Sequence, residues 1–415
     1  MSNAEAARRE QQASYAMLER VFREEAGRLT ASLVRHLGDF DLAEELVSEA
    51  VVEALERWPR DGAPERPGAW LLTTARHKGL DRLRREARYR QKLELLAALP
   101  ESPDAEPDDR LRLIFMCCHP SLAKEAQIAL TLRAVAGLTT GEIARAFMLP
   151  EPTLAKRITR AKQKIVSAAV PYRVPALDEL RSRLDEVLTV IYLVFNEGYL
   201  ATAGEAAIRR DLARDAEWLA GLLVNLLPNE PEPQGLLALI RLHLARWPAR
   251  LNARGEFVLL EDQDRSVWDW RQIADALRLL KRAAAHGRPG RYQVEAAIAG
   301  AHCEAPTWTA TNWPQILELY SLLMALDPSP VVALNRAIAV RYVDGPARAL
   351  DEVDRLAEAL DRYHLFHATR AALLSDLGRH ADAAAADARA LELTQNAAER
   401  ALLRDRLAGL EFDQD

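Results

Sequence analysis

The sequence has little cysteine and no long hydrophobic run. Three cysteines among 415 residues (Cys117, Cys118 and Cys303) cannot form a disulfide framework. The longest apolar run, Val187 to Phe195, is interrupted by Thr189 and is far shorter than the ~20 residues of a membrane span. The N-terminus lacks the apolar segment of a signal peptide. These absences predict a cytoplasmic protein with no membrane partner.

Alternating apolar and polar runs, which mark β-strands, are also nearly absent. Apolar residues recur instead at helical spacing, and Leu, Ala, Arg and Glu, which form helices readily, fill the chain. The sequence therefore predicts an all-α fold.

Motifs of enzyme active sites are missing as well. The chain contains no Walker loop, no Gly-x-Ser-x-Gly and no His-Glu-x-x-His motif. The run Cys117-Cys118-His119 lacks the spacing and the second ligand pair of a zinc site. We expect no enzyme activity, no catalytic residue, no metal and no cofactor.

Charge is distributed unevenly along the chain. The formal net charge of −6 excludes a uniformly basic nucleic-acid coat, but not a local basic patch. The charge is +1 over residues 1–92, −6 over 93–109, +7 over 110–170 and −8 over 171–415. The second segment includes three prolines and a block of acids between Pro100 and Asp109, which predicts a linker between two helical modules. Pro171 and Pro175 mark a further boundary.

A helix-turn-helix is expected over residues 122–167. Leu122 to Val135 forms one amphipathic helix, Gly137 ends it, and Thr139 or Thr140 caps a short helix through Phe147. The next helix, from Glu151 to about Val166, has an apolar stripe that we expect to face inward: Ala155, Ile158, Ala161 and Ile165. Its polar face is basic and suits contacts with DNA: Thr153, Lys156, Arg157, Arg160, Lys162 and Lys164. The competing interpretation is a helical hairpin with a solvated basic face.

The first module is also helical. Tyr15 to His36 forms one helix, and Asp41 caps a second from Leu42 to Trp58 with an acidic face. After the loop Pro59 to Gly68, the helix from Trp70 to Arg85 is apolar on one side and basic on the other. The loop could hold an unpaired base, with Trp58 and Trp70 stacking on it, although we favour a core position for both tryptophans.

In order and spacing, residues 15–170 resemble a group IV, or extracytoplasmic-function, sigma factor of bacterial RNA polymerase. The resemblance implies that Asp39 to Trp58 docks on core polymerase, Trp70 to Arg85 faces the promoter −10 element, and Leu122 to Ser167 reads the −35 element. The core-polymerase-binding candidates are Asp39, Asp41, Glu44, Glu45 and Glu49. The DNA-binding candidates are Arg76, Lys78, Arg82, Arg84, Arg85, Thr153, Lys156, Arg157, Arg160 and Lys164.

The rest of the chain is similar to the helical, tetratricopeptide-like extension of one sigma subgroup. Gly345 and Gly378 lie 33 residues apart, close to the ~34-residue period of such repeats. Helical segments repeat around them: Val331 to Val343 with Ala347 to Leu360, Ala371 to Ala383 with Ala390 to Leu393, and a weaker copy over Tyr292 to Leu326. An irregular helical bundle is the alternative.

The resemblance divides the chain into five parts. They are residues 10–92 (region 2), 93–110 (acidic linker), 111–170 (region 4), 177–290 (first helical domain of the extension) and 291–412 (tetratricopeptide-like repeats). The extension is expected to regulate activity, with a regulatory protein as its partner. Two polar runs within it, Phe195 to Tyr199 and Leu259 to Ser266, could line a pocket, but helix caps and interhelical hydrogen bonds are the favoured interpretation.

Two other functions remain open from the sequence. The first is a conventional helix-turn-helix transcriptional regulator with a tetratricopeptide-like sensor domain. The second is a helical hydrolase with its site in residues 177–290, which no motif supports.

Overall fold

The structure is a computed structural model that describes residues 25–412, apart from 26, 63, 86–107, 148, 200–209, 253–256 and 395. In this described part the regular secondary structure is helical, and Leu251 and Phe257 form an isolated antiparallel bridge. The all-α prediction is confirmed. The chain divides into two units, Met1–Leu193 and Val194–Asp415, and each is described by itself below.

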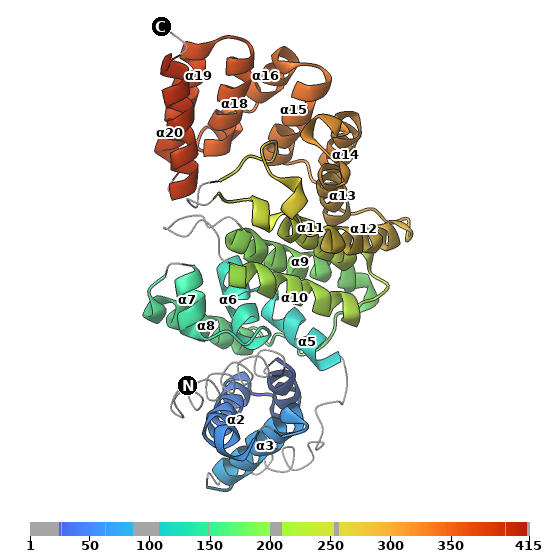
Figure 1. Ribbon diagram of the computed structural model, residues 1–415. Helices are drawn as coiled ribbons and strands as arrows, with labels where there is room; N and C mark the ends of the chain where they lie inside the picture. Colours follow the sequence, from blue (N-terminus) through green and yellow to red (C-terminus); the bar gives the residue numbers. More distant parts are fainter. Residues whose placement is uncertain are drawn as a thin grey trace, which may run out of the picture. The chain divides into compact units, whose positions relative to one another are not determined.

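The first unit begins with a helix over residues 27–37, followed by α2 (Phe40–Asp61) and α3 (Pro67–Arg85). Helices α2 and α3 pack side by side (Figure 1). The buried face of α2 repeats every three to four residues, as an amphipathic helix requires; it consists of Phe40, Ala43, Leu46, Val47, Ala50, Ala54 and Trp58.

Two details of α2 differ from the prediction. The cap is Asp39 and not Asp41, because the Asp39 carboxylate accepts the Leu42 backbone N–H at 3.1 Å. The helix also continues past Pro59, which was expected to begin a loop. Pro59 cannot donate a hydrogen bond to the carbonyl of Leu55, and the helix ends two residues later at Asp61. The connection to α3 is therefore shorter than predicted.

The predicted acidic linker is shorter at its C-terminal end. Helix α5 (Asp108–Cys117) already begins at Asp108, whereas residues 93–107 lie outside the described residues. Asp109 is buried, and its charge is matched by Arg112 at 2.8 Å and by Arg35 at 3.5 Å. Acidic residues also suit the first turn of a helix.

The helix-turn-helix segment contains α6 (Lys124–Ala134), α7 (Thr140–Ala146) and α8 (Glu151–Ser167). Gly137 between α6 and α7 has a φ of 74°, which favours glycine. The start of α9 (Leu177–Tyr199) packs on this part of the chain. Arg183 donates to the Phe115 carbonyl at 2.8 Å, and Glu186 pairs with Lys124. The first turns of the expected extension thus belong to the first unit.

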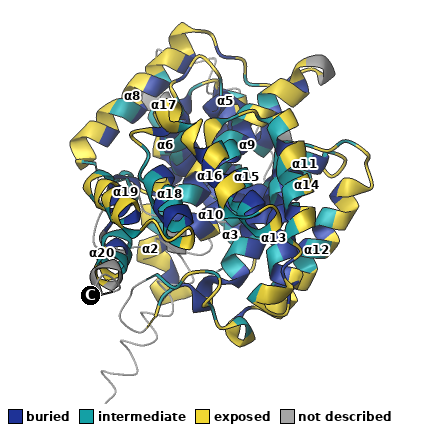
Figure 2. Ribbon diagram, turned by 90° about the horizontal axis from the view of Figure 1, so that it is seen from above, coloured by how far each residue is buried: buried dark blue, intermediate teal, exposed yellow. Residues whose placement is uncertain are grey.

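The second unit is built around α11 (Pro231–Ala245), which is buried along almost its whole length. It packs against α10 (Arg210–Leu226), α12 (Trp270–Ala284) and α13 (Arg291–Glu304). Two short 3₁₀ helices, η2 (Trp247–Ala249) and η3 (Arg265–Val267), lie between α11 and α12 in the chain. Figure 2 shows α12 exposed on one side and buried on the other.

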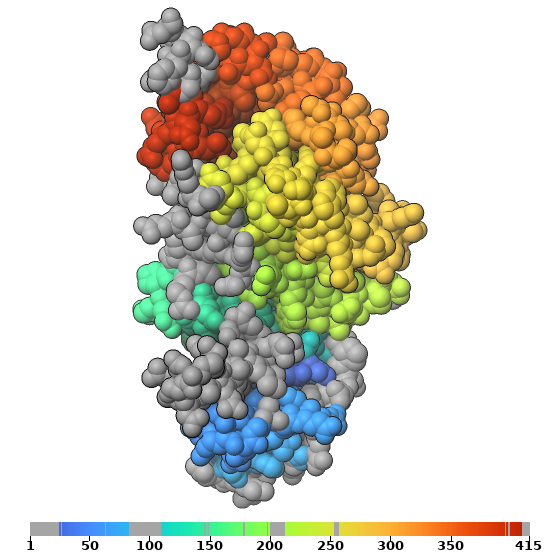
Figure 3. Space-filling model, in the orientation of Figure 1, coloured from blue at the N-terminus to red at the C-terminus, as the bar shows by residue number. Residues whose placement is uncertain are grey.

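The remaining helices pack mainly on their neighbours in the chain. They are α14 (Trp313–Leu326), α15 (Pro330–Val343), α16 (Pro346–Asp354), α17 (Ala357–Leu360), α18 (His364–Asp376), α19 (His380–Leu393) and α20 (Ala397–Phe412). Figure 3 shows the same succession as adjacent orange and red segments. Gly345 and Gly378, with φ of 92° and 71°, follow α15 and α18 at equivalent turns. The expected single helix from Ala347 to Leu360 is divided into α16 and α17.

No helix among the described residues has the length and apolar character needed to cross a membrane.

Candidate nucleic-acid interface

Helix α7, the first of the two helices expected for the helix-turn-helix, begins with a capping box. The Thr139 hydroxyl accepts the Glu142 backbone N–H at 3.1 Å, and the Glu142 carboxylate accepts the Thr139 backbone N–H at 2.6 Å. This reciprocal pair satisfies two helix N–H groups, and it identifies Thr139 as the N-cap rather than Thr140. Ile143 and Ala144 are buried as expected, and Phe147 is partly buried.

Helix α8 buries one side and exposes the other. Its buried residues are Leu154, Ile158, Ala161 and Ile165, so Leu154 takes the place predicted for Ala155, which is exposed. The stripe begins one residue earlier because Leu154 continues the i, i+4 spacing from Ile158. Five of the candidates for −35 contacts lie on the other side of α8: Thr153, Lys156, Arg160 and Lys164 are exposed, and Arg157 is half-buried.

The basic side chains of this outer face have no acidic partner in the described part of the chain. No described carboxylate forms an ion pair with Lys156, Arg157, Arg160 or Lys164. Their positive charges therefore remain available to phosphate groups. Residues near the start of such a helix are the ones that reach base edges in a major groove.

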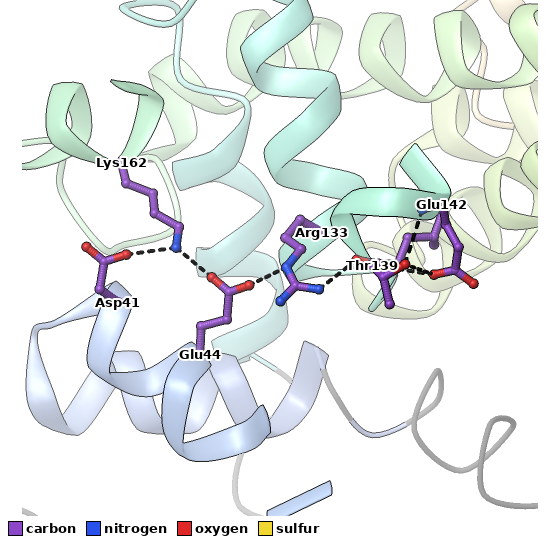
Figure 4. Close-up of polar contacts among 7 residues, drawn as sticks. Asp41, Glu44, Arg133, Thr139, Glu142 and Lys162 are labelled. Atoms are coloured by element: carbon purple, nitrogen blue, oxygen red, sulfur yellow. Dashed lines mark hydrogen bonds and ion pairs between the residues drawn. The ribbon is translucent and has the colours of Figure 1, made fainter. Parts of the chain in front are cut away.

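Lys162 does not belong to this outer face. Its ammonium group lies 2.7 Å from the Asp41 carboxylate and 2.6 Å from the Glu44 carboxylate (Figure 4). Burial lowers the pKa of Lys162, but Glu44 and Asp41 outweigh it and leave the pKa above its usual value. Arg133 of α6 binds Glu44 from the other side. Two residues of the first module thus hold side chains of the helix-turn-helix module.

The predicted acidic face of α2 is largely engaged within the chain. Asp39 caps the helix, and Glu44 is held by Lys162 and Arg133. Asp41 keeps 76% of its side chain exposed. Arg82 of α3 lies 2.7 Å from Glu45 and 3.9 Å from Glu49.

Helix α3 presents the candidates for −10 contacts. Arg76 and Lys78 are half-buried, and Lys78 lies 2.7 Å from Glu53 of α2. The hydrogen bond from Lys78 is the main reason that the pKa of Glu53 is lowered. The side chains of Arg84 and Arg85 lie outside the described residues.

The sequence did not predict the roles of Glu53, Arg133 and Lys162 in the ion pairs around α2. Glu53 could have been found, because it follows Glu45 and Glu49 at i+4 spacing on α2. No local pattern indicates the roles of Arg133 and Lys162, since each depends on contact between segments more than 80 residues apart.

The two tryptophans occupy different positions. Trp58 is buried, with 4% of its surface exposed, as favoured from the sequence. Trp70 is only partly buried and packs edge-on against Trp58, with ring centroids 5.4 Å apart.

The cysteines are not arranged as metal ligands. All three are buried thiols, and burial raises the pKa of Cys118 to about 12. Among the described residues, no group of three or more His, Cys, Asp or Glu side chains could hold a metal ion.

Known protein families match three segments of the chain. Residues 21–89 match sigma-70 region 2, and residues 112–165 match sigma-70 region 4. Residues 183–284 match a family of unknown function, DUF6596. An uncharacterized protein of Rhizobium meliloti (strain 1021) is 44% identical over 387 residues, covering 91% of this chain and 92% of that protein.

Two helical modules in this order, the second a helix-turn-helix, define a promoter-recognition subunit of transcription. The chain belongs to the extracytoplasmic-function sigma factors of RNA polymerase, here with a C-terminal helical extension. It directs core polymerase to specific promoters for transcription initiation, and core polymerase and promoter DNA are its partners. A conventional helix-turn-helix regulator is not favoured, because it does not account for region 2. Sigma factor families are not enzymes.

Proposed function

We propose that the outer face of α8 contacts the −35 element, that α3 faces the −10 element, and that the acidic face of α2 docks on core polymerase. The observation that carries this proposal is the outer face of α8, where Lys156, Arg157, Arg160 and Lys164 have no described acidic partner. Thr153, near the start of the helix, is exposed beside them. An exposed basic helix following a tight turn fits the major groove.

The test for α8 measures promoter binding by the reconstituted holoenzyme. Replacing Arg157 or Arg160 by Ala should weaken binding by about 1–3 kcal/mol if the side chain contacts a base, and should lower the slope against log salt by about 1 if it contacts a phosphate. Gln163→Ala is the matched control, because Gln163 is exposed on the same helix and uncharged. Equal binding by all three variants would contradict the assignment.

The −10 proposal rests on α3, whose candidates are Arg76, Lys78, Arg82, Arg84 and Arg85. Lys78 and Arg82 are paired with Glu53 and Glu45 in this chain, so DNA has to compete with these carboxylates. Arg82→Ala should reduce run-off transcription without weakening core binding, because the substitution leaves the proposed docking acids Glu45 and Glu49 in place. A loss of core binding instead would place Arg82 in the polymerase contact.

The docking proposal rests on the acids of α2: Asp39, Asp41, Glu44, Glu45 and Glu49. Asp41→Asn tests it best, because Asp41 is the most exposed of those in ion pairs and does not cap the helix. We expect weaker capture of core polymerase by the full-length chain, since a basic partner surface would lose one charge pair. Unchanged capture at several salt concentrations would remove Asp41 from the interface.

We also propose that the extension regulates activity. The same proposal divides the chain into five parts: residues 10–92, 93–110, 111–170, 177–290 and 291–412. Residues 171–415 carry a charge of −8, and in this proposal they screen the basic modules until a regulatory protein partner binds. A chain ending at Tyr199 tests this, because it keeps the contacts of Arg183 and Glu186 with α5 and α6. Higher run-off transcription is expected, and unchanged or abolished transcription would contradict autoinhibition.

We also propose that the chain acts in the cytoplasm with no catalytic residue, metal or cofactor of its own. The absence of active-site motifs from the sequence supports this, as does the chemistry of initiation, which the polymerase supplies. The hydrolase alternative would require loss of an activity in Glu261→Ala or Asp264→Ala without loss of folding.

A further inference from the structure

Two polar runs in the second unit lead to one group of arginines. The first run ends at Tyr199, whose ring lies under the Arg250 guanidinium at 3.5 Å from its centroid. The second run contains Arg265, whose guanidinium lies 4.6 Å from the centroid of Trp268. We call Arg246, Arg250 and Arg265 the arginine cluster. The sequence favoured helix caps and interhelical hydrogen bonds for both runs. Among their described residues, Asp264 caps η3 by accepting the Ser266 backbone N–H at 2.9 Å, and Arg265 donates to carbonyls at the end of α13.

Two members of the arginine cluster are buried with unsatisfied N–H groups. Only 8% of Arg246 and 9% of Arg250 is exposed. Nε of Arg246 and Nη1 of Arg250 are buried and have no hydrogen-bond acceptor among the described residues. Burying a guanidinium costs folding free energy unless its N–H groups have acceptors and its charge has a negative partner. The positions therefore require acceptors that the described side chains do not provide.

Arg265 adds a third donor group. Its Nη1 donates to the carbonyls of His302 and Ala305 at 2.7 and 2.6 Å, which fixes the guanidinium. Its Nη2 is buried and without an acceptor in the described part of the chain, and the same holds for Nε1 of Trp268. Arg246 lies close enough to contribute to the lowered pKa of both Arg250 and Arg265, so the three charges share one neighbourhood.

Negative charge near the arginine cluster is scarce. No side-chain carboxylate that the structure describes forms an ion pair with any of its members. Glu399 contributes to the pKa of Arg250 from a distance, but it already binds Thr394 and His364. Burial, followed by the neighbouring arginines, holds the pKa of His243 well below its usual value. The same causes lower the pKa of His302 to about 4. Both histidines stay neutral beside the guanidinium groups.

Aromatic rings surround this positive charge. Tyr199 packs against His243 and Trp247, with ring centroids 4.9 and 5.8 Å apart, and Phe257 lies 5.2 Å from the Arg250 guanidinium. Apolar walls with a few fixed charged donors are typical of small-molecule sites. Low local polarity also strengthens the attraction of a guanidinium for an anion.

We propose that the arginine cluster is a binding site for the oxyanion group, phosphate or carboxylate, of a small molecule. Guanidinium groups bind both kinds of oxyanion through paired N–H donors. The ligand would supply the acceptors and the negative charge that the described side chains lack. This site is independent of promoter and polymerase binding, so it does not depend on the proposed function above.

The test is thermal unfolding of the full-length chain in phosphate, in acetate and in chloride at matched ionic strength, with calorimetric titration of the same anions. We expect a saturable rise in melting temperature with phosphate or acetate and none with chloride. The anion that stabilises identifies the class of ligand. No saturable effect of either oxyanion on the wild-type chain overturns the proposal.

Variants locate the site. Arg250→Gln should weaken oxyanion binding at least tenfold, whereas Arg278→Gln should bind as the wild type does, because Arg278 is exposed and paired with Asp275 on α12. Should Arg250→Gln not fold, Arg265→Gln makes the same test, since Arg265 is only partly buried. Binding that is equal in wild type and cluster variants shows an adventitious anion elsewhere and overturns the proposal.

Discussion

Lys162 is one of the residues that connect region 2 to region 4. It bridges Asp41 and Glu44, and Glu44 is also bound by Arg133. A half-buried ammonium with two carboxylate partners is stabilised more than an exposed pair, because water screens it less. Asp41 and Glu44 are also candidates for binding core polymerase, so Lys162 competes with core polymerase for these carboxylates.

Replacing Lys162 by Met should therefore tighten binding to core polymerase several-fold, because it frees Asp41 while Arg133 still neutralises Glu44. The binding of full-length chain to core polymerase measures the effect without DNA. Lys164→Met is the control, since Lys164 is exposed on the same helix without a described acidic partner. Weaker binding by the Lys162 variant alone would mean that the contact supports docking.

Asp387 is a buried acid in the extension. It is fully buried, its carboxylate accepts no hydrogen bond in the described part of the chain, and Arg406 lies 3.2 Å away. Burial outweighs Arg406 and raises the pKa of Asp387 to about 6. The native state then holds the proton more tightly than the unfolded state, so this residue reduces stability as pH rises from about 4 to 6.

Asp387→Asn should remove that penalty. Relative to wild type, the variant should gain up to about 3 kcal/mol of unfolding free energy between pH 4 and pH 7. Denaturant unfolding of the full-length chain at the two pH values measures the difference. A difference between variant and wild type that does not change with pH would show that Asp387 is ionised normally.

At the scale of elements, the approach of α11 to α13 depends on Gly235. A Cβ at this position would lie 2.7 Å from the Gln293 backbone nitrogen, so the two helices would have to separate. Gly221 on α10 offers a contrast, because a Cβ there meets nothing within 4 Å. Both glycines lie inside helices, and alanine has the same intrinsic advantage of about 1 kcal/mol over glycine at each.

Gly221→Ala should therefore stabilise the second unit by about 0.5–1 kcal/mol, whereas Gly235→Ala should destabilise it by about 1–3 kcal/mol through overpacking. Urea denaturation of the full-length variants gives both values. Equal effects of the two substitutions would show that α11 and α13 can separate freely.

The start of α7 depends on the capping box of Thr139 and Glu142. Thr139→Ala should lower the unfolding free energy of the helix-turn-helix by about 1 kcal/mol, because the Glu142 N–H loses its acceptor. Thr159→Ala is the control, since Thr159 is exposed and bonds only the Ala155 carbonyl. Hydrogen exchange across α7 should rise in the first variant only. No change in exchange would mean that packing alone holds the helix.

The sequence predicts a feature best where that feature depends on a single helix or turn. The exposed basic side of α8 and the turn at Gly137 follow from helical spacing and glycine chemistry. The position of Lys162 could not be predicted. This residue lies at the edge of the buried stripe, four residues after Ile158, and its ion-pair partner Asp41 is on a different helix, α2. The burial of Arg246 and Arg250 could not be predicted either, because it depends on tertiary packing and not on a local pattern.

At the scale of the whole molecule, the contact between α2 and α8 is expected to open in the transcription complex. Cysteines placed at Val52 and Val166, which are 55% and 78% exposed, can carry fluorescent labels, because the native cysteines are buried. Energy transfer between the labels should be high in the free chain and fall when core polymerase and promoter are added. Unchanged transfer in a complex that contains polymerase would show that the contact persists.

The Lys162 contact also fixes an order of events. The −10 and −35 elements occupy separate positions along a promoter, and each intervening base pair adds about 3.4 Å of B-form DNA. If α3 and α8 face these two elements as proposed, modules held together by the 2.7 Å ion pair cannot lie on both elements of one promoter at once. We therefore expect the free factor to occupy promoters weakly, and full sequence discrimination to begin when polymerase separates the two modules.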